Sequence, residues 1–470
     1  MSAAARPALN VVPSTPLDSI SGLADRLRRT FGSGKTRPLE WRRSQLKALK
    51  ALVRERGDEL VEALQADLRK PTLEAWAADV GQVTTEAAMA LRKLRSWTKP
   101  QRTGFFPLGR SRIVHEPLGV VLIIAPWNYP VGLLLTPLVG AVAAGNCAVL
   151  KPSEVTMRTS AVLGRRIPEY LDPEAIAIVE GGVDETQALL DQRFDHIFYT
   201  GNGRVGRVVM EAAAKHLTPV TLELGGKSPC IVDHDVDLKV AARRIAWGKF
   251  MNAGQTCIAP DYILVHEGRE QELVRELGAA IHDFFGDDPK RTPDYARVVN
   301  RRHHERLTKL LESGEAAIGG QSDPEDCYIA PTVLRGVAKD SPIMQEEIFG
   351  PILPILSVRG VDDAIEFVRR GEKPLALYLF SSSEATAEKV VGATSSGGVC
   401  VNGTIFHIAN PALPFGGVGE SGMGAYHGRH TFETFSHKKS VLSRGLRFDP
   451  KWMYPPYGGL KTKLVQRFLK

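Results

Sequence analysis

The chain has 470 residues, of which 43% are hydrophobic and 24% charged, and a chain of this length is expected to fold as two or three domains rather than around one core. Its net charge is +7, but nine Lys and Arg residues against Asp449 alone give residues 438–470 a net charge of +8. Because the rest of the chain is near neutral and its basic residues are not interleaved with aromatic ones, the charge pattern disfavours nucleic-acid binding.

The N-terminal part is expected to be helical after a disordered leader. Residues 1–19, MSAAARPALNVVPSTPLDS, contain no apolar core of signal-peptide length. From Leu46 to Leu68, leucines and valines recur at helical spacing, with a break at Gly57 and Asp58. Roughly the first 100 residues are therefore predicted to be mostly helical.

The most apolar stretch, residues 118–150, is not predicted to cross a membrane. Pro126, Asn128, Pro130 and Pro137 interrupt it, so it offers no continuous apolar run of about 20 residues. A buried strand, a Pro-rich turn, a buried helix and a second buried strand explain the stretch better.

Strands then alternate with helices as far as Glu223. The predicted strands are Gly119–Ala125, Cys147–Lys151, Ala175–Val179, His196–Thr200 and Pro219–Glu223, separated by helices Pro137–Ala144, Ser160–Tyr170, Thr186–Asp191 and Gly203–His216. This rhythm predicts right-handed βαβ units and a mainly parallel sheet. A second α/β region follows, with helices Leu238–Asn252, Glu270–Phe285 and Asn300–Ser313 and strands Tyr262–His266 and Val399–Asn402.

A Gly-x-Gly-x-x-Gly sequence follows the strand that ends at Thr200. Gly201, Gly203 and Gly206 match the turn that binds pyrophosphate at a helix N-terminus. That fingerprint also expects an acidic residue about 20 residues further on, and the nearest acid to that spacing is Glu223. Glu223 is a catalytic candidate as well, so two interpretations compete for one residue.

Among the five cysteines, Cys257 is the candidate nucleophile. The cysteines are scattered without a CxxC pair, which disfavours disulfides and zinc and favours a reducing compartment. Cys257 lies in a turn after Gly254, among small and polar residues where a substrate can reach a thiol. An inert, half-buried cysteine is the commoner alternative. The remaining four fit that alternative: Cys147, Cys230, Cys327 and Cys400.

Polar residues follow several predicted strands. Glu223 ends one at the carboxyl edge of the sheet, where burial would raise its pKa as a general base requires, although a strand-end cap is an equal alternative. Asn128, between two prolines, can donate to a developing oxyanion, but an ordinary Asn turn is the simpler interpretation. Lys151 and Glu154 can bind a ribose or phosphate, or simply pair with each other.

Taken together, seven blocks resemble the aldehyde dehydrogenase superfamily, in that family's order. They are APWNYP (125–130), LKPSE (150–154), TGNGRVG (200–206), LELGGKSP (222–229), GQTC (254–257), EEIFGPI (346–352) and PFGGVGESGMG (414–424). Finer features, such as Asn202, GQTCIAPDY and YHGRHTFETFSHKK, resemble the class-3 branch. Position 203 is usually not glycine in that branch, so Gly203 is interpreted as an incidental match.

The resemblance implies a mechanism and a set of site residues. Cys257 would attack an aldehyde carbonyl as a thiolate, with the Asn128 side chain and the Cys257 N–H stabilising the oxyanion. Hydride transfer to nicotinamide would leave a thioester, hydrolysed by water that Glu223 activates. The implied cofactor contacts are Trp127, Lys151, Glu154, Gly201, Asn202, Gly206, Leu224, Glu347 and Phe349. The implied substrate pocket contains Tyr129, Thr256, Ile258 and His407.

The family fold implied is α/β, with a Rossmann-like cofactor domain (1–97 and 117–225), an α/β catalytic domain (226–413) and a small bridging β-arm (98–116 and 414–470, the latter including the basic tail). An arm that completes a neighbour's sheet favours a homodimer. A cytoplasmic location is expected, without a metal site or a membrane span. The tail is at most a candidate for peripheral contact with an anionic membrane surface.

The predicted activity is oxidation of an apolar aliphatic or aromatic aldehyde to its acid with NAD(P)+. Glu154 would repel a 2′-phosphate, so NAD is favoured and NADP remains possible. A CoA-acylating dehydrogenase would not need Glu223, and a catalytically silent scaffold would not need Cys257, Glu223 and Asn128 together. A cysteine hydrolase without nucleotide would not need the LKPSE and EEIFGPI blocks.

Overall fold

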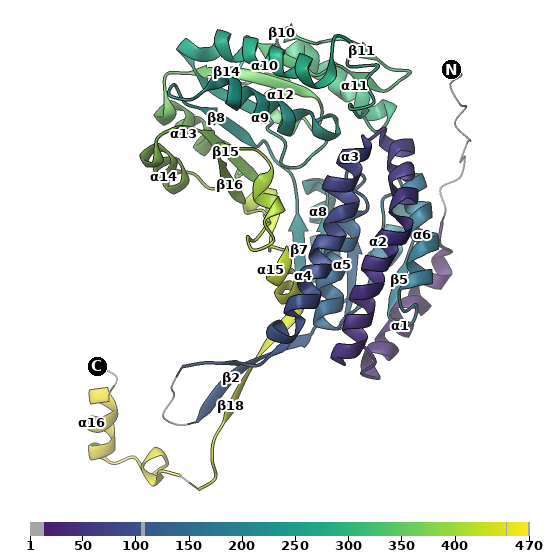
Figure 1. Ribbon diagram of the computed structural model, residues 1–470. Coiled ribbons are helices and arrows are strands. Elements are labelled where there is room, and N and C mark those ends of the chain that lie inside the picture. The colour runs from purple at the N-terminus through teal and green to yellow at the C-terminus, as the bar shows by residue number, and fades with distance from the viewer. Residues whose placement is uncertain (1–13, 105–108, 448, 469–470) are drawn as a thin grey trace.

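Two mainly parallel sheets, each flanked by helices, form the body of the computed structural model, and a β-arm extends from them (Figure 1). The structure describes residues 14–104, 109–447 and 449–468. This arrangement confirms the α/β class predicted from the alternation of strands and helices.

The first sheet has six strands in the order β17-β7-β6-β3-β4-β5. Their bounds are β3 Val120–Ile124, β4 Cys147–Lys151, β5 Ile176–Ile178, β6 His196–Thr200, β7 Val220–Glu223 and β17 Gly422–Met423. All pairs are parallel except β17 with β7. Every residue of β3, β4 and β6 is buried, as expected for parallel strands covered on both faces.

Two groups of helices cover this sheet. One contains α2 (Leu39–Leu68), α4 (Gly81–Thr98), α5 (Gly132–Ala144) and α6 (Met157–Tyr170), with α5 packed on β3 and β4. The other contains α1 (Leu17–Gly32), α7 (Val183–Leu190) and α8 (Gly203–Ala214). Between α2 and α4 lie the short helix α3 (Thr72–Glu74) and a π-helical turn, η1 (Ala75–Val80).

The end of the expected leader is ordered. The prediction of disorder is wrong for residues 14–19, because α1 begins at Leu17 and Ser14 donates to the Glu185 carboxylate. The N–H of Thr15 also donates to the carbonyl of Glu180 at 2.9 Å. These contacts join residues far apart in the chain, so local composition does not reveal them. Residues 1–13 of the predicted leader lie outside the described residues.

The second sheet has seven strands in the order β10-β13-β14-β9-β8-β15-β16, parallel except for β10. Its strands are β8 Pro229–Val232, β9 Tyr262–His266, β10 Glu315–Ile318, β13 Thr332–Arg335, β14 Ile352–Val358, β15 Ala376–Phe380 and β16 Gly398–Val401. Its helices are α9 Leu238–Phe250, α10 Glu270–Phe285, α11 Arg301–Leu310, α12 Pro342–Gln345, α13 Val361–Arg370 and α14 Glu384–Ala393. A separate two-stranded sheet pairs β11 (Ser322–Asp323) with β12 (Tyr328–Ile329).

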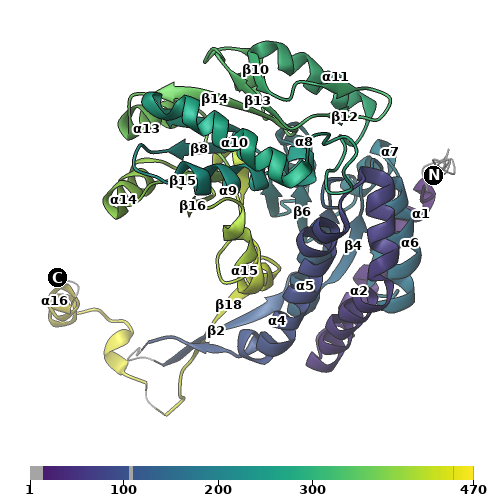
Figure 2. The ribbon, with the colours of Figure 1, turned by 45° about the horizontal axis from the view of Figure 1, so that its top comes forward.

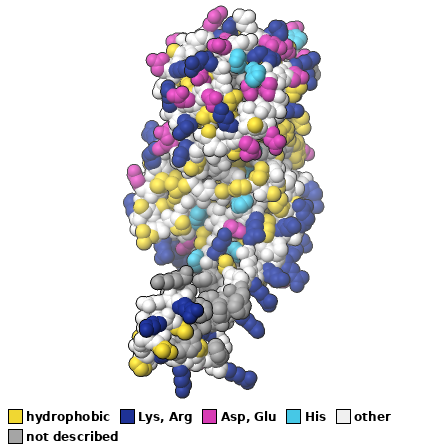
Figure 3. Space-filling model, turned by 90° about the vertical axis from the view of Figure 1, so that its left-hand side faces the viewer, with side chains coloured by type: hydrophobic (Ala, Val, Ile, Leu, Met, Phe, Trp, Pro, Cys, Tyr) yellow, Lys and Arg dark blue, Asp and Glu magenta, His cyan; other side chains and the backbone are white. Residues whose placement is uncertain are grey.

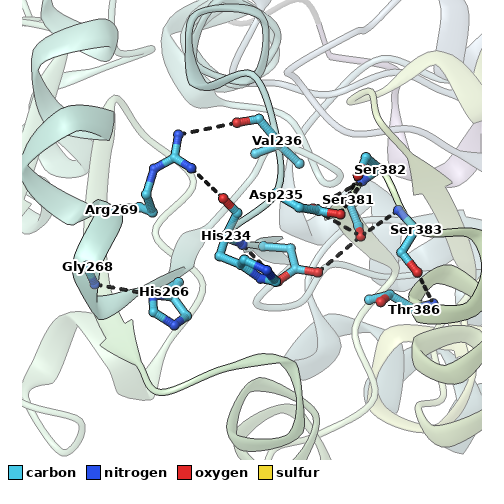
Figure 4. Close-up of polar contacts among 11 residues, drawn as sticks. His234, Asp235, Val236, His266, Gly268, Arg269, Ser381, Ser382, Ser383 and Thr386 are labelled. Carbon is cyan, nitrogen blue, oxygen red and sulfur yellow. Dashed lines mark hydrogen bonds and ion pairs between the residues drawn. The ribbon is translucent and has the colours of Figure 1, made fainter.

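Hydrogen bonds join the loop at the carboxyl end of β8 to the loop at the carboxyl end of β15 (Figure 4). Ser381 donates to the Asp233 carboxylate at 3.1 Å, and the N–H of Ser382 donates to Asp235 at 3.2 Å. Ser383 caps α14 by accepting from the N–H of Thr386. These loops are therefore fixed to each other by hydrogen bonds. They lie at the carboxyl edge of the second sheet, opposite the edge at which β9 begins.

The arm pairs β2 (Arg110–Pro117) with β18 (Ser436–Ser443), and β1 (Gln101–Arg102) extends it. The expected boundary at residue 414 differs from the structure, because Gly422 and Met423 of β17 pair with Glu223 and Leu222 in the first sheet. α15 (Gly428–Thr434) also packs against α5. The other expected domain boundaries remain predictions.

The C-terminal tail ends in α16 (Gly459–Phe468), which lies at the end of the arm, away from both sheets (Figures 1 and 2). Lys and Arg side chains are numerous on the lower part of the face seen in Figure 3. In the tail, Arg444, Lys451 and Lys463 are exposed. Within the described ranges, no helix combines the length and apolarity that crossing a membrane requires.

Candidate active site

The carboxyl ends of neighbouring strands bring several predicted residues to one edge of the first sheet. Ile124 at the end of β3 pairs with Lys151 at the end of β4, and Thr200 at the end of β6 pairs with Glu223 at the end of β7. β6 lies beside β3 although β4 and β5 come between them in the chain, so the strand order reverses there. Such a reversal is where open α/β sheets bind ligands.

The Cys257 loop connects α9 to the amino end of β9. α9 ends at Phe250 rather than at the predicted Asn252, because a 3-10 turn follows in which Asn252 and Ala253 are both left-handed, with φ of 51°. Gly254 has φ of +73°, and a Cβ there would lie 2.2 Å from the carbonyl oxygen of Gly350. Only glycine suits that position, and the turn after it carries Cys257.

Hydrogen bonds join the Cys257 loop to the loop after β3. The Nδ2 of Asn128 donates to the carbonyl of Gln255 at 3.1 Å, and the hydroxyls of Tyr129 and Thr256 lie 2.7 Å apart. Asn252 bridges both loops, since its Nδ2 donates to the carbonyls of Asn128 and Gln255 at 3.1 and 3.2 Å. The amide predicted to stabilise an oxyanion is thus fixed beside the cysteine loop.

Glu223 is buried beside Cys257. The residue is only 1% exposed, and both of its carboxylate oxygens lack a hydrogen-bond partner among the described residues. Burial raises the pKa of Glu223 to about 8, and the Cys257 thiol beside it opposes that rise. A carboxyl group with this pKa exchanges its proton near neutral pH, as a general base must.

Burial, and then the charges of Glu223 and Glu347, raise the pKa of the Cys257 thiol well above its usual value. Burial also raises the pKa of Cys147 to about 12, so thiol acidity does not set Cys257 apart. The neighbours of Cys257 distinguish it from the other cysteines, because the described contacts place Glu223 and the Asn128 loop beside it.

The start of α8 forms a turn suited to a phosphate group. Asn202 is the N-cap of this 12-residue helix, and its side chain accepts from the N–H of Val205 at 3.0 Å. A Cβ at Gly201 would lie 2.2 Å from the Tyr199 hydroxyl, and one at Gly206 would lie 3.0 Å from the side chain of Leu224. A Cβ at Gly203 would meet only the tip of Arg207, at 3.2 Å. The backbone thus needs glycine at 201 far more than at 203.

A dinucleotide fits the polar groups at this edge. The Thr200 hydroxyl is buried without a hydrogen-bond partner among the described residues. Glu154 has a side chain 42% exposed, 3.9 Å from the Lys151 ammonium. Lys151 itself is buried and donates to the carbonyls of Pro152 and Gly181 at 2.8 and 2.6 Å. Helix N-termini bind phosphate, and a partly exposed carboxylate accepts from ribose hydroxyls.

Glu347, Phe349 and Trp127 form a second group near the first. A Cβ at Gly225 would lie 2.0 Å from the Glu347 carboxylate, so this carboxylate lies directly against the turn after Glu223. Burial and then the Asp261 carboxylate raise the pKa of Glu347 to about 8. Phe349 has φ of 48° and packs edge-on against the Trp127 ring, with centroids 5.3 Å apart.

The predicted substrate-pocket residues are mostly buried. Tyr129 is 7% exposed, Thr256 6% and Ile258 1%, whereas His407 is half-buried and packs between the rings of Tyr378 and Phe415. Their roles remain predictions. Sequence reasoning missed Lys70, Asp79 and Asn252, whose polar side chains are buried against the Asn128 loop.

The sequence and the fold of the chain are similar to those of known proteins. Residues 12–441 match the model of the aldehyde dehydrogenase family. The chain is 50% identical to the mouse aldehyde dehydrogenase named dimeric NADP-preferring, over 94% of this chain and 98% of that one, and 51% identical to rat aldehyde dehydrogenase family 3 member A2, over 94% and 93%. The solved substrate-bound state of Staphylococcus aureus AldH has a TM-score of 0.93 and 46% identity, covering 96% of this chain and 99% of that one.

Proposed function

Because the chain belongs to the aldehyde dehydrogenase family and is an NAD(P)-dependent enzyme, we propose that it oxidises apolar aliphatic or aromatic aldehydes to carboxylic acids. The proposed reaction passes through a covalent intermediate on Cys257. The relatives of the chain belong to the class-3 branch of the family. The observation that carries the proposal is the placement of a buried, unpartnered Glu223 carboxyl group and the Asn128 amide beside the Cys257 loop. The similarity to aldehyde dehydrogenases extends over nearly the whole chain.

The first step is attack of the Cys257 sulfur on the aldehyde carbon. The thiol proton passes to the ionised Glu223 carboxylate or to water, a C–S bond forms, and the carbonyl electron pair moves onto oxygen. Asn128 carries two N–H groups, of which one donates to Gln255, so the other is available for the oxyanion. The Cys257 backbone N–H is the second proposed donor.

Bound NAD(P)+ supplies the acceptor for the hydride that leaves the thiohemiacetal carbon. Loss of that hydride leaves an acyl thioester on Cys257. Glu223 then accepts a proton from water as the water oxygen attacks the thioester carbon. The C–S bond breaks, Cys257 leaves as a thiolate, and the carboxylic acid is released.

Glu154 favours NAD over NADP in this proposal. Its half-exposed carboxylate is the acidic side chain next to Lys151 at the carboxyl end of β4, where it can accept from both ribose hydroxyls. A 2′-phosphate there would meet a like charge, which is unfavourable. The mouse relative is named NADP-preferring, so the two proteins are expected to differ in cofactor preference.

A homodimer is the proposed assembly, consistent with the name of the dimeric mouse relative. β18 lies at an outer position of the arm, and β16 lies at an outer position of the second sheet. An edge strand offers unpaired backbone groups, so one chain's arm can extend its neighbour's sheet. We place the enzyme in the cytoplasm, with its basic tail as a candidate for contact with anionic membranes.

The proposed activity is tested by following NADH or NADPH formation with aldehydes of graded chain length and ring type. Wild-type protein is expected to turn over apolar aldehydes with NAD, and Cys257→Ala is expected to form no reduced cofactor. Turnover by Cys257→Ala at a substantial fraction of the wild-type rate would contradict the proposal. A strict requirement for coenzyme A would instead favour the acylating alternative, which the buried Glu223 disfavours.

A further inference from the structure

Lys70 and Asp79 form a buried ion pair directly beneath the Asn128 loop. The Lys70 ammonium lies 3.2 Å from the Asp79 carboxylate, and both side chains are 0% exposed. A buried ion pair is rarely more stable than apolar side chains of the same volume, because each charge must leave water. Stability alone therefore does not explain why this ion pair lies beside the proposed site.

The ammonium of Lys70 makes three contacts, two of them with the Asn128 loop. It donates to the main-chain carbonyl of Asn128 at 2.7 Å, and it lies over the Tyr129 ring, 4.0 Å from its centroid. Together with Asp79, these partners surround the ammonium group. Lys70 thus contacts two residues that bind the Cys257 loop, since Asn128 donates to Gln255 and Tyr129 pairs with Thr256.

Asp79 holds the other side of the same turn. It belongs to the π-helical turn η1, a kind of turn that is frequent at functional sites, and its carboxylate accepts from the N–H of Gly132 at 2.6 Å. A Cβ at Gly132 would lie 3.0 Å from the Asp79 carbonyl oxygen, so the two segments are in close contact. The pair therefore binds this segment at two points: Lys70 contacts Asn128, and Asp79 contacts Gly132, the first residue of α5.

We propose that Lys70 is a positioning residue for the oxyanion site: its ammonium, anchored by Asp79, fixes the main chain of Asn128 so that the Asn128 amide faces the Cys257 loop. This inference rests on the proposed function, because it concerns how the oxyanion donor is held. Asn252 supports the same carbonyl from the cysteine side, at 3.1 Å, so two buried donors fix one peptide group. Oxyanion stabilisation depends on donors that are already in place when charge develops.

A double-mutant cycle tests this role. Lys70→Met keeps most of the side-chain volume and removes the charge and its hydrogen bonds, and Asn128→Ala removes the amide that Lys70 is proposed to place. The measured quantity is the single-turnover rate of hydride transfer at saturating aldehyde and NAD, per NAD-binding site. Lys70→Met is expected to slow this rate by roughly 10- to 100-fold in the wild-type background, since small displacements of reacting groups have effects of that size.

In the Asn128→Ala background, Lys70→Met is expected to change the rate by less than about threefold, because residues that act through each other are not additive. A merely structural role predicts the same slowing in both backgrounds. Arg42→Met is the matched control, because Arg42 is a buried cation of α2 that donates to the carbonyls of Thr36 and Ala143. Its loss should lower thermal stability and leave the hydride-transfer rate within about twofold of wild type.

Additive effects of Lys70→Met and Asn128→Ala, or no slowing by Lys70→Met, would overturn the positioning role while leaving the proposed function intact. If Asn128→Ala alone left the rate unchanged, the oxyanion assignment itself would fail, and the positioning role with it. Should Lys70→Met not fold, Asp79→Asn enters the same cycle. It keeps an oxygen for the Gly132 N–H while removing the charge that anchors Lys70, and the same non-additivity with Asn128→Ala is expected.

Discussion

The side-chain amide of Asn128 donates to the main-chain carbonyl of Gln255 at 3.1 Å, across 127 residues of sequence. This bond joins the loop at the carboxyl end of β3 in one sheet to the loop before β9 in the other. The proposed oxyanion donor and the proposed nucleophile therefore come from different sheets. Their relative position depends on contacts between the loops, including those of Asn252 and Lys70.

Glu223→Gln is expected to separate the two halves of the reaction. The amide cannot accept a proton from water, so steady-state turnover should fall by about 10²–10⁴-fold. The first turnover should still release one reduced cofactor per site, because hydride transfer precedes deacylation. Rapid-mixing absorbance at the NADH band measures both phases. Loss of the burst without slowing of the steady state would exclude Glu223 as the deacylation base.

The activity should depend on pH through Glu223. Burial raises its pKa to about 8, so the base form is present above that pH and turnover should rise as pH increases from 6 to 9. Glu223→Gln should weaken this dependence, whereas Glu347→Gln, at a carboxyl group that titrates in the same range, should keep it. A wild-type profile that is flat from pH 6 to 9 would contradict the assignment.

The same pKa shift predicts a change in stability. The folded protein holds the Glu223 proton between the usual pKa near 4.5 and about 8, whereas the unfolded chain releases it. The free energy of unfolding should therefore decrease as pH rises through this window, and less steeply in Glu223→Gln. Equilibrium urea unfolding of both proteins at pH 5 and pH 8.5 measures the difference.

Two glycines of the turn before α8 should respond differently to alanine. Gly203→Ala meets only the flexible end of Arg207 and should leave the NAD dissociation constant within about twofold of wild type. Gly201→Ala would place a methyl group against the Tyr199 hydroxyl and displace the turn, weakening NAD binding by about tenfold or more. Fluorescence titration with NAD compares them. Equal dissociation constants would mean that this turn does not shape the cofactor site.

Cofactor preference should depend on Glu154. Glu154→Gln removes the negative charge while keeping an oxygen for the ribose, so kcat/KM with NADP should rise relative to that with NAD by about tenfold. Glu174→Gln, at an exposed carboxylate paired with Lys35, is a surface control and should leave the ratio unchanged. An unaltered ratio in Glu154→Gln would remove the basis for preferring NAD.

Much of the fold follows from local sequence patterns. The strand Tyr262–His266 and the helix Glu270–Phe285 have the predicted bounds, because their apolar periodicity coincides with clear turn residues. Glu223 was expected at a sheet edge with a raised pKa, and it is found there, since a carboxylate that ends an apolar strand has few other places to lie.

What the sequence did not reveal depends on contacts between distant segments. α9 stops at Phe250, and the Asn252 and Ala253 that follow are left-handed, a conformation that local propensity does not favour for Ala. Lys70 follows a helix in an otherwise polar context, and nothing in its neighbourhood indicates that it turns inward to meet Asp79 and Asn128. Such buried polar pairs become visible only when the packed structure is known.

In the proposed mechanism, Cys257 carries the acyl group between hydride transfer and hydrolysis. The most direct test is to mix Glu223→Gln with NAD and an apolar aldehyde, quench in acid and measure the mass of the cysteine peptides. We expect one adduct per chain, on the Cys257 peptide, with the mass of the aldehyde less two hydrogen atoms. Reduced cofactor released without that adduct, or with the adduct on Cys147, Cys230, Cys327 or Cys400, would contradict it.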